Sequence, residues 1–366
     1  MKMKTAIKLP RIMVVFSLIL IGSLLFPIVT NAFQNASTQP GRFGYISYIA
    51  DQFDCQQAYS TIAELTKDEY EGRLTGSEGG KKAAAWIAEQ FDSFTLQPYK
   101  EGSYYQAVTN SLSLSTGDNV IGFIPSSDRT CQQSIIIGAH YDHLGKSFSG
   151  QIYRGANDNA SGTSVVMEIA RVLSKTILLS SVHIIFIAFT GEEQGLYGSK
   201  QYSNEPLYPL NHALAMFNLD MVGTGTGSWE MGTNFNKQEP SRQVLKEALR
   251  IKKLKIKEAD WMMKPVSDHY PFYQKGIPVM CLLKENPTNL GGYHNFKDTI
   301  ESIDPKNLNE CGSFCLLTIL SLLHDYLVIP NLEKEQAAFL RCVYMDVCFK
   351  KEEILKLFKS RYVISS

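Results

Sequence analysis

Short apolar runs alternate with segments of helical periodicity along the middle of the chain. The runs at residues 134–137, 182–189, 213–219 and 277–283 are almost unbroken, as in strands buried on both faces of a parallel sheet. The segment that begins at Gly162 instead places its apolar residues on one helical face. Strands that alternate with helices predict an α/β fold, with a single doubly wound domain whose mostly parallel, mixed central sheet is flanked by helices.

The segments on either side of this core have patterns of their own. Residues 55–91 read as helical, with an interruption at 71–77 whose last residue, Ser77, suits a helix N-cap. Residues 92–130 alternate between apolar and polar positions, as strands at a sheet edge do. Residues 305–328 predict a closing apolar helix.

The first 32 residues have the pattern of a signal peptide. A basic start precedes the nearly unbroken apolar run at 12–29, and residues 30–32 then offer small side chains for cleavage. A retained transmembrane anchor is the alternative, because about 18 apolar residues nearly span a bilayer. Gly22 and Pro27 favour cleavage. We therefore expect a secreted or otherwise exported protein, extracellular or periplasmic.

Charge and cysteine content bear on the expected partners and on disulfide formation. The 36 basic and 36 acidic residues balance, and removal of four basic residues with the signal segment leaves 32 against 36, a net charge of −4. This charge does not indicate a nucleic-acid partner. Seven cysteines leave at least one unpaired. We expect a lead-in at 33–54, one catalytic domain at 55–328 and a basic C-terminal extension at 329–366.

Two adjacent glutamates, Glu192 and Glu193, follow the apolar run 182–189 after a two-residue turn. Ligands of open α/β sheets bind at the carboxyl ends of the strands. Two carboxylates side by side repel each other and lose hydration there, and a metal ion offsets that cost. One carboxylate can then hold the metal while its neighbour transfers protons.

Five residues at strand-to-loop junctions have side chains that bind metals: His140, Asp158, Glu193, Asp220 and His294. Imidazole nitrogens and carboxylate oxygens are ligands of zinc. Five ligands are too many for one tetrahedral zinc with an open position, but they suit two zinc ions if one carboxylate bridges them.

The surrounding motifs carry a family resemblance. They occupy residues 72–77, 138–145, 155–162, 191–199, 218–223, 267–269 and 293–294. With these motifs the chain resembles, over residues 55–328, the zinc-dependent exopeptidases of metallopeptidase family 28, which include secreted aminopeptidases. The resemblance implies two Zn²⁺ ions per chain, one held by His140 and Asp220 and the other by Glu193 and His294, with Asp158 as the bridge.

The resemblance also implies two residues that assist catalysis without binding metal. Glu192 would be the general base, and Asp142 would accept a hydrogen bond from the far nitrogen of His140 and fix its tautomer. Tyr141 and His143 alternate with these residues, so we expect both side chains to point away from the metals.

The expected function is hydrolysis of the N-terminal peptide bond of peptide substrates by a zinc-activated water. A glutaminyl-peptide cyclotransferase shares the fold, but there a tryptophan usually precedes the last histidine, where this chain has Tyr293. A carboxypeptidase or dipeptidase of the same family stays open. A non-enzymatic binding protein is disfavoured because no ligand position is substituted. We expect no nucleic-acid partner and no membrane contact once the signal segment is removed.

Overall fold

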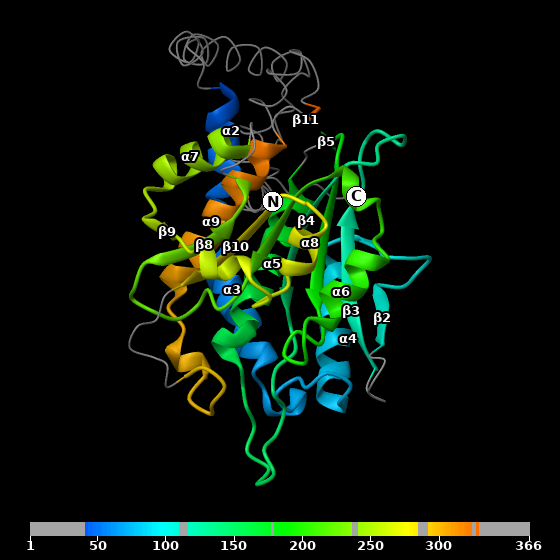
Figure 1. Cartoon of the computed structure of the whole chain (residues 1–366), viewed down its shortest axis with the longest axis vertical. Coiled ribbons are helices and arrows are strands. Elements are labelled where there is room, and N and C mark those ends of the chain that lie inside the picture. Colours follow the sequence, from blue (N-terminus) through cyan, green and yellow to red (C-terminus); the bar gives the residue numbers. More distant parts are fainter. Residues whose placement is uncertain are drawn as a thin grey trace, which may run out of the picture. The chain divides into compact units, whose positions relative to one another are not determined.

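A nine-stranded mixed sheet runs through the computed structural model of the protein (Figure 1). Its strand order is β1-β3-β6-β4-β7-β10-β8-β9, with β2 paired to β3. The strands are β1 Gln97–Pro98, β2 Tyr105–Thr109, β3 Thr116–Ile124, β4 Ser134–His140, β6 His183–Phe189, β7 Ala213–Leu219, β8 Trp229–Thr233, β9 Ile256–Glu258 and β10 Val279–Lys284. The central strands β6, β4, β7 and β10 are mutually parallel, whereas β3 and β8 pair antiparallel to them. This arrangement confirms the predicted doubly wound α/β fold.

The structure describes residues 41–109, 116–176, 179–235, 241–284, 292–323 and 327–328. The chain divides into two compact units between residues 48 and 49, and the sheet with its flanking helices belongs to the second unit. Helix α2, Gly41–Ala50, lies across that boundary. The expected signal segment and the expected C-terminal extension lie outside the described residues. Among the described residues, no helix has the length and apolar character needed to cross a membrane.

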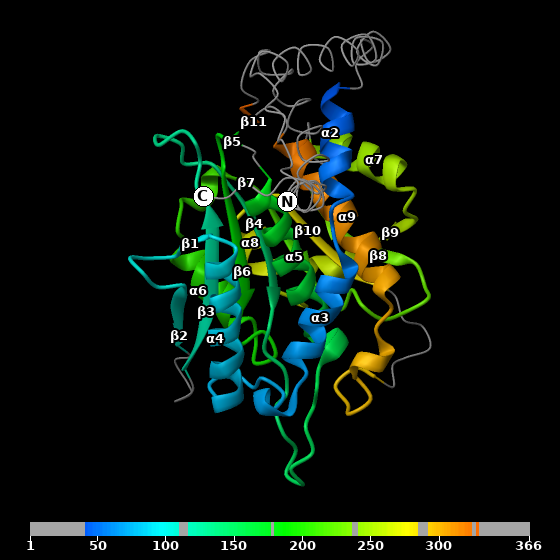
Figure 2. The same cartoon turned by 180° about the vertical axis from the view of Figure 1, so that it is seen from behind.

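Helices cover both faces of the sheet. Figure 2 shows the face covered by α3 Cys55–Leu65, α4 Glu78–Ser93, α5 Gly162–Lys175 and α9 Pro305–Leu322. The opposite face carries α6 Tyr197–Asn204 and α8 Tyr270–Gln274, and α7 Ser241–Lys252 packs against α9. Short helical turns complete the fold at Asp68–Tyr70, Ala156–Ser161, Leu210–His212, Asp260–Met263 and Ile300–Ser302.

The central strands form because their apolar runs are buried on both sides. Every residue of β4 and of β6 is buried, which is the environment that a continuous apolar run predicts. Phe189, Phe272 and Tyr202 pack together on the face covered by α6 and α8. Strands of this kind give the site rigid supports, because their ends cannot shift without disturbing the core.

Two local expectations can be compared with the structure. The predicted interruption of the first helical segment is confirmed, since α4 begins at Glu78 and Ser77 caps it by accepting a hydrogen bond from the Gly80 N–H at 3.0 Å. The predicted helix over 305–328 is too long. Helix α9 ends at Leu322, and Leu327–Val328 forms β11, which pairs with β5 at Leu179–Ser180. Hydrophobicity alone does not separate helix from strand in a short apolar run.

Candidate metal and catalytic site

Three neighbouring parallel strands deliver four of the candidate residues to one edge of the sheet. His140 is the last residue of β4, the pair Glu192 and Glu193 follows β6 after Thr190 and Gly191, and Asp220 follows β7 directly. Because β4 pairs in parallel with both β6 and β7, the carboxyl ends of these strands lie side by side. The site therefore lies where open α/β sheets bind their ligands.

Asp158 comes from the loop that leads into α5, and neighbouring side chains hold this loop in place. The carboxylate of Asp298 accepts hydrogen bonds from the backbone N–H groups of Asn157 at 2.7 Å and Asp158 at 2.9 Å. The side-chain amide of Asn159 donates to the carbonyl of Leu219 at 2.9 Å, which ties the loop to the end of β7. Sequence reasoning did not identify Asp298 or Asn159 as supports, because both contacts join segments far apart in the chain.

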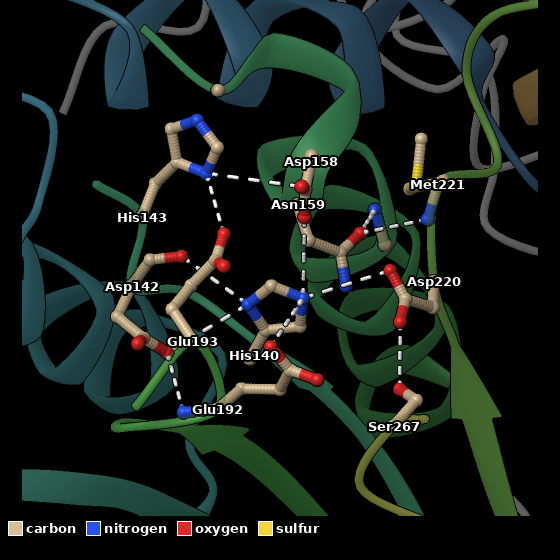
Figure 3. Close-up of polar contacts among 12 residues, drawn as sticks. His140, Asp142, His143, Asp158, Asn159, Glu192, Glu193, Asp220, Met221 and Ser267 are labelled. Atoms are coloured by element: carbon tan, nitrogen blue, oxygen red, sulfur yellow. Dashed lines mark hydrogen bonds and ion pairs between the residues drawn. The ribbon is translucent and has the colours of Figure 1, made fainter. Parts of the chain in front are cut away.

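His140 lies at the centre of one half of the site (Figure 3). Its Nε2 is 3.5 Å from Asp158 Oδ1, 3.5 Å from Asp220 Oδ1 and 4.0 Å from Glu192 Oε2. The imidazole is buried, as are Asp158 and Asp220. One nitrogen therefore faces three carboxylates at distances that leave room for a cation among them.

His294 faces the other half of the site. Its Nε2 is 2.9 Å from Glu193 Oε2 and 3.3 Å from Asp158 Oδ2. The two oxygens of Asp158 thus face the two predicted ligand sets, one each. The structure brings all five candidate ligands together, and it places Asp158 between the two histidines.

His143 also lies in the site, so the expectation that it points away was wrong. Its Nδ1 is 2.8 Å from Glu193 Oε1 and 3.9 Å from Asp158 Oδ2. Side-chain alternation holds only along a strand, and β4 ends at His140. Tyr141 does turn away, because its hydroxyl donates to the carbonyl of Asp118 at 2.9 Å.

Several buried polar atoms in the site have no hydrogen-bond partner among the described residues. They include Asp158 Oδ2 and Asp220 Oδ1. An unpartnered buried polar atom costs roughly 1–3 kcal/mol, and more if it is charged. Each of these oxygens lies near an imidazole nitrogen, Asp158 Oδ2 near His294 and Asp220 Oδ1 near His140. Carboxylate oxygens with imidazole nitrogens form a donor set that suits zinc. The residues present therefore fit metal ions.

The side chains of the site form two clusters that could each hold a metal ion. One joins His140, Glu192 and Asp220, and the other joins His143, Asp158 and Glu193, with all ligand atoms in each cluster within 4.8 Å of one another. These clusters differ from the predicted sets in including Glu192 and His143.

The two adjacent glutamates have opposite proton affinities. Burial, together with the charges of Asp268 and Asp220, raises the pKa of Glu192 to about 10, although His140 opposes this. Burial would also raise the pKa of Glu193, but hydrogen bonds from His143 and His294 outweigh it and lower that pKa. One carboxylate of the pair is therefore held as an anion, while its neighbour readily accepts a proton.

The residues around the candidate ligands are themselves oriented by hydrogen bonds. The nearest oxygen of Asp142 to His140 Nδ1 is its main-chain carbonyl at 3.2 Å, whereas its carboxylate Oδ1 is 3.7 Å away. The expected contact from the Asp142 carboxylate is thus made by the backbone of the same residue. Ser267 donates to Asp220 Oδ2 at 2.6 Å, which leaves Asp220 Oδ1 facing His140 (Figure 3).

A mixed sheet with imidazole and carboxylate groups gathered at its strand ends defines an α/β protein with a candidate metal site. The family model described as peptidase family M28 matches residues 119–319. The chain belongs to this family, which confirms the resemblance drawn from its motifs.

Individual known proteins resemble this chain in sequence or in fold. Aminopeptidase YwaD of Bacillus subtilis (strain 168) is 30% identical over 283 residues, which are 75% of this chain and 58% of that protein. The structure of BSAP, a zinc aminopeptidase from Bacillus subtilis, superimposes with a TM-score of 0.59 at 21% identity and covers 73% of this chain and 94% of its own. Porphyromonas gingivalis glutaminyl cyclase superimposes with a TM-score of 0.60 at 19% identity, over 73% of this chain and 98% of its own. The two structural likenesses bear on the fold alone.

Proposed function

We propose that this chain is a zinc-dependent aminopeptidase that removes N-terminal residues from peptides with two zinc ions. The observation that carries the proposal is the position of Asp158, whose Oδ1 is 3.5 Å from His140 Nε2 and whose Oδ2 is 3.3 Å from His294 Nε2. A carboxylate with one oxygen toward each of two histidines is placed to bridge two cations. The likeness to Aminopeptidase YwaD supports the choice of reaction.

In this proposal His140 and Asp220 would hold one zinc, Glu193 and His294 would hold the other, and Asp158 would contribute to both. We prefer His294 to His143 as the ligand because its Nε2 faces both Glu193 and Asp158 at 2.9 and 3.3 Å. His143 Nδ1 is 3.9 Å from Asp158 but only 2.8 Å from Glu193. His143 therefore acts as a hydrogen-bonding support that orients Glu193.

When bound, the zinc pair would supply an activated water and polarise the scissile carbonyl. Glu192 transfers the proton. Its carboxylate lies 4.0 Å from His140 Nε2, and burial raises its affinity for a proton. Near the positive charge of bound zinc it would stay ionised until it takes the proton from the water. The same group then returns the proton to the leaving amine. Glu193 remains the anionic ligand because His143 and His294 stabilise its charge.

Purified protein with a known zinc content tests the proposal directly. We expect hydrolysis of amino-acid amides and free peptides, its loss with a zinc chelator and its recovery when zinc is restored. Peptides with a blocked amino terminus should not be cleaved. Equal rates on blocked and free peptides would contradict an aminopeptidase and favour another exopeptidase or an endopeptidase.

A glutaminyl-peptide cyclotransferase is the second candidate, because a glutaminyl cyclase shares this fold, although Tyr293 stands where such enzymes usually have a tryptophan. A peptide with N-terminal glutamine separates the two activities, because cyclisation releases ammonia without cleaving a peptide bond. Ammonia release with no free amino acid would replace the aminopeptidase assignment.

We also propose that the N-terminal segment directs export of the protein. The apolar run at 12–29 and the small residues that follow it support this proposal. Expression of the full chain in a secreting host, followed by N-terminal sequencing of the exported product, should give a chain that begins near residue 33. Protein retained with Met1 in the membrane fraction would instead identify the segment as an anchor.

A further inference from the structure

The turn between the first two helices of the domain lies against the site although it is distant in sequence. Residues 72–77 precede α4 and lie outside the region matched by the family model. Within this turn, Thr75 has a buried side chain. The proposed function assigns this residue no role, yet its hydroxyl contacts the segment that carries Glu192.

The hydroxyl of Thr75 makes three hydrogen bonds. It donates to Asp142 Oδ2 at 3.0 Å, and it accepts from the Gly191 N–H at 2.9 Å. The hydroxyl of Thr190 lies 3.2 Å away and must be the donor of that pair, because the single proton of Thr75 is already directed to Asp142. One donor and two acceptor positions are the full capacity of a threonine hydroxyl.

These bonds reach the backbone of the general base from two sides. Asp142, oriented by Thr75 through Oδ2, accepts the Glu192 N–H at its other oxygen, Oδ1, at 3.3 Å. Gly191, whose N–H Thr75 accepts directly, has a φ of +69°, a conformation that glycine adopts at little cost. Two successive amides, at Gly191 and Glu192, are therefore fixed by one hydroxyl and the carboxylate that it orients.

We propose that Thr75 is a positioning residue for Glu192. Its hydroxyl fixes the Gly191 amide directly and the Glu192 amide through Asp142. This inference rests on the proposed function, in which Glu192 carries the proton. A displacement of a catalytic group by about 1 Å can lower a rate by about 100-fold, so a hydroxyl that sets this backbone has a measurable effect on turnover. The zinc ligands, held by other contacts, should keep their affinity.

Two substitutions at position 75 separate the hydroxyl from the shape of the side chain. Thr75→Val keeps the branched shape and removes the hydroxyl, whereas Thr75→Ser keeps the hydroxyl and removes the methyl group. Thr190→Val is the matched control, because it removes a neighbouring buried hydroxyl that contacts Thr75 and Tyr141, while the Gly191 and Glu192 amides donate to Thr75 and Asp142.

The measurements are kcat and KM on an amino-acid amide, zinc content, and hydrogen exchange resolved to single amides. For Thr75→Val we expect kcat to fall about 10- to 100-fold, with KM and zinc content unchanged and faster exchange at the Gly191 and Glu192 amides. Thr75→Ser and Thr190→Val should keep kcat within about threefold of the wild type, the small change expected when the key hydrogen bonds remain.

Several results would overturn the inference. A Thr75→Val enzyme with wild-type kcat would do so, as would a Thr75→Ser enzyme that is equally impaired. A parallel loss of kcat and zinc would show a structural role instead. If Thr75→Val does not fold, exchange in the wild type still decides, because unprotected amides at Gly191 and Glu192 would mean that the contacts do not form. An inactive wild type with protected amides would refute the proposed function separately.

Discussion

Replacement of Arg73 should reveal how strongly the same turn stabilises the domain. Its guanidinium is completely buried and donates to four backbone carbonyls. These are Tyr141 at 2.7 Å, Leu65 at 2.7 Å, Arg154 at 2.7 Å and Gly155 at 2.8 Å. Burial lowers the pKa of Arg73 to about 10, so the group stays charged at neutral pH.

The magnitude follows from these four bonds. A hydrogen bond that involves a charged group contributes about 1.5 kcal/mol or more, so Arg73→Met should lower the free energy of unfolding by roughly 6 kcal/mol. At roughly 2 °C per kcal/mol, the value at the large end of the range for domains of 150–250 residues, that loss corresponds to a decrease in Tm of about 12 °C. Arg73→Lys keeps the charge but cannot reach four carbonyls together, so its Tm should be intermediate.

Thermal unfolding followed by circular dichroism, with zinc held at one free concentration, is the assay. Arg129→Met is the matched control, because Arg129 is exposed and a surface substitution usually changes stability by less than about 0.5 kcal/mol. An Arg73→Met protein whose stability is within about 1 kcal/mol of the wild type would refute the reasoning, since four lost charged hydrogen bonds cannot be worth so little.

The other predictions concern the metals and the surface. Glu192→Gln should keep both zinc ions and lower kcat by about 10²- to 10⁴-fold, and a fully active variant, measured on an amino-acid amide, would contradict its role as general base. Glu193→Ala should bind less zinc by elemental analysis, and unchanged zinc content would remove it from the ligand set. Zinc removal should lower the free energy of unfolding by about 4 kcal/mol for each site, so by about 8 kcal/mol for two sites, relative to protein at free zinc 1,000-fold above Kd, and a Tm insensitive to chelation would argue against bound zinc. Phe148, 116% exposed, should tolerate Phe148→Ser without a change in Tm, and a clear decrease would reveal packing that the structure does not contain.

The strands that could be predicted from the sequence are those with both faces buried and an almost unbroken apolar run. Strands β4, β6 and β7 were found because both of their faces are buried or nearly so, which makes their apolar runs continuous. Strand β8 was missed although it is equally buried. It contains Glu230, which accepts hydrogen bonds from Lys257 at 3.2 Å and Trp261 at 3.1 Å, and a polar residue satisfied by such distant partners interrupts the pattern.

The candidate ligands were predicted for a related reason. His140, Glu193 and Asp220 stand at strand ends, where the sheet topology alone brings residues together. Asp158 and His294 lie in loops, and the family motifs around them identified these two. His143 was misplaced because alternation was extended past the end of β4. Thr75 could not be recognised as a support, because its partner Gly191 lies 116 residues further along the chain and no local pattern encodes that contact.

The balance of buried charge bears on the number of metals. Seven carboxyl groups gather in and around the site: Asp142, Asp158, Glu192, Glu193, Asp220, Asp268 and Asp298. Among the described residues, Arg73 is the one arginine or lysine classed as buried. Six negative charges would therefore lack compensation if all seven groups were ionised and the histidines were neutral, as metal binding requires. One zinc ion would leave four of them, and two zinc ions would leave two. Glu192 and Asp268 account for that remainder: burial raises the pKa of Asp268 to about 7, so this group is partly neutral at pH 7, whereas Glu192 keeps the charge that its role as proton acceptor requires. Two divalent cations therefore fit the charges of this site better than one, and a titration that saturates at one zinc per chain would contradict the argument.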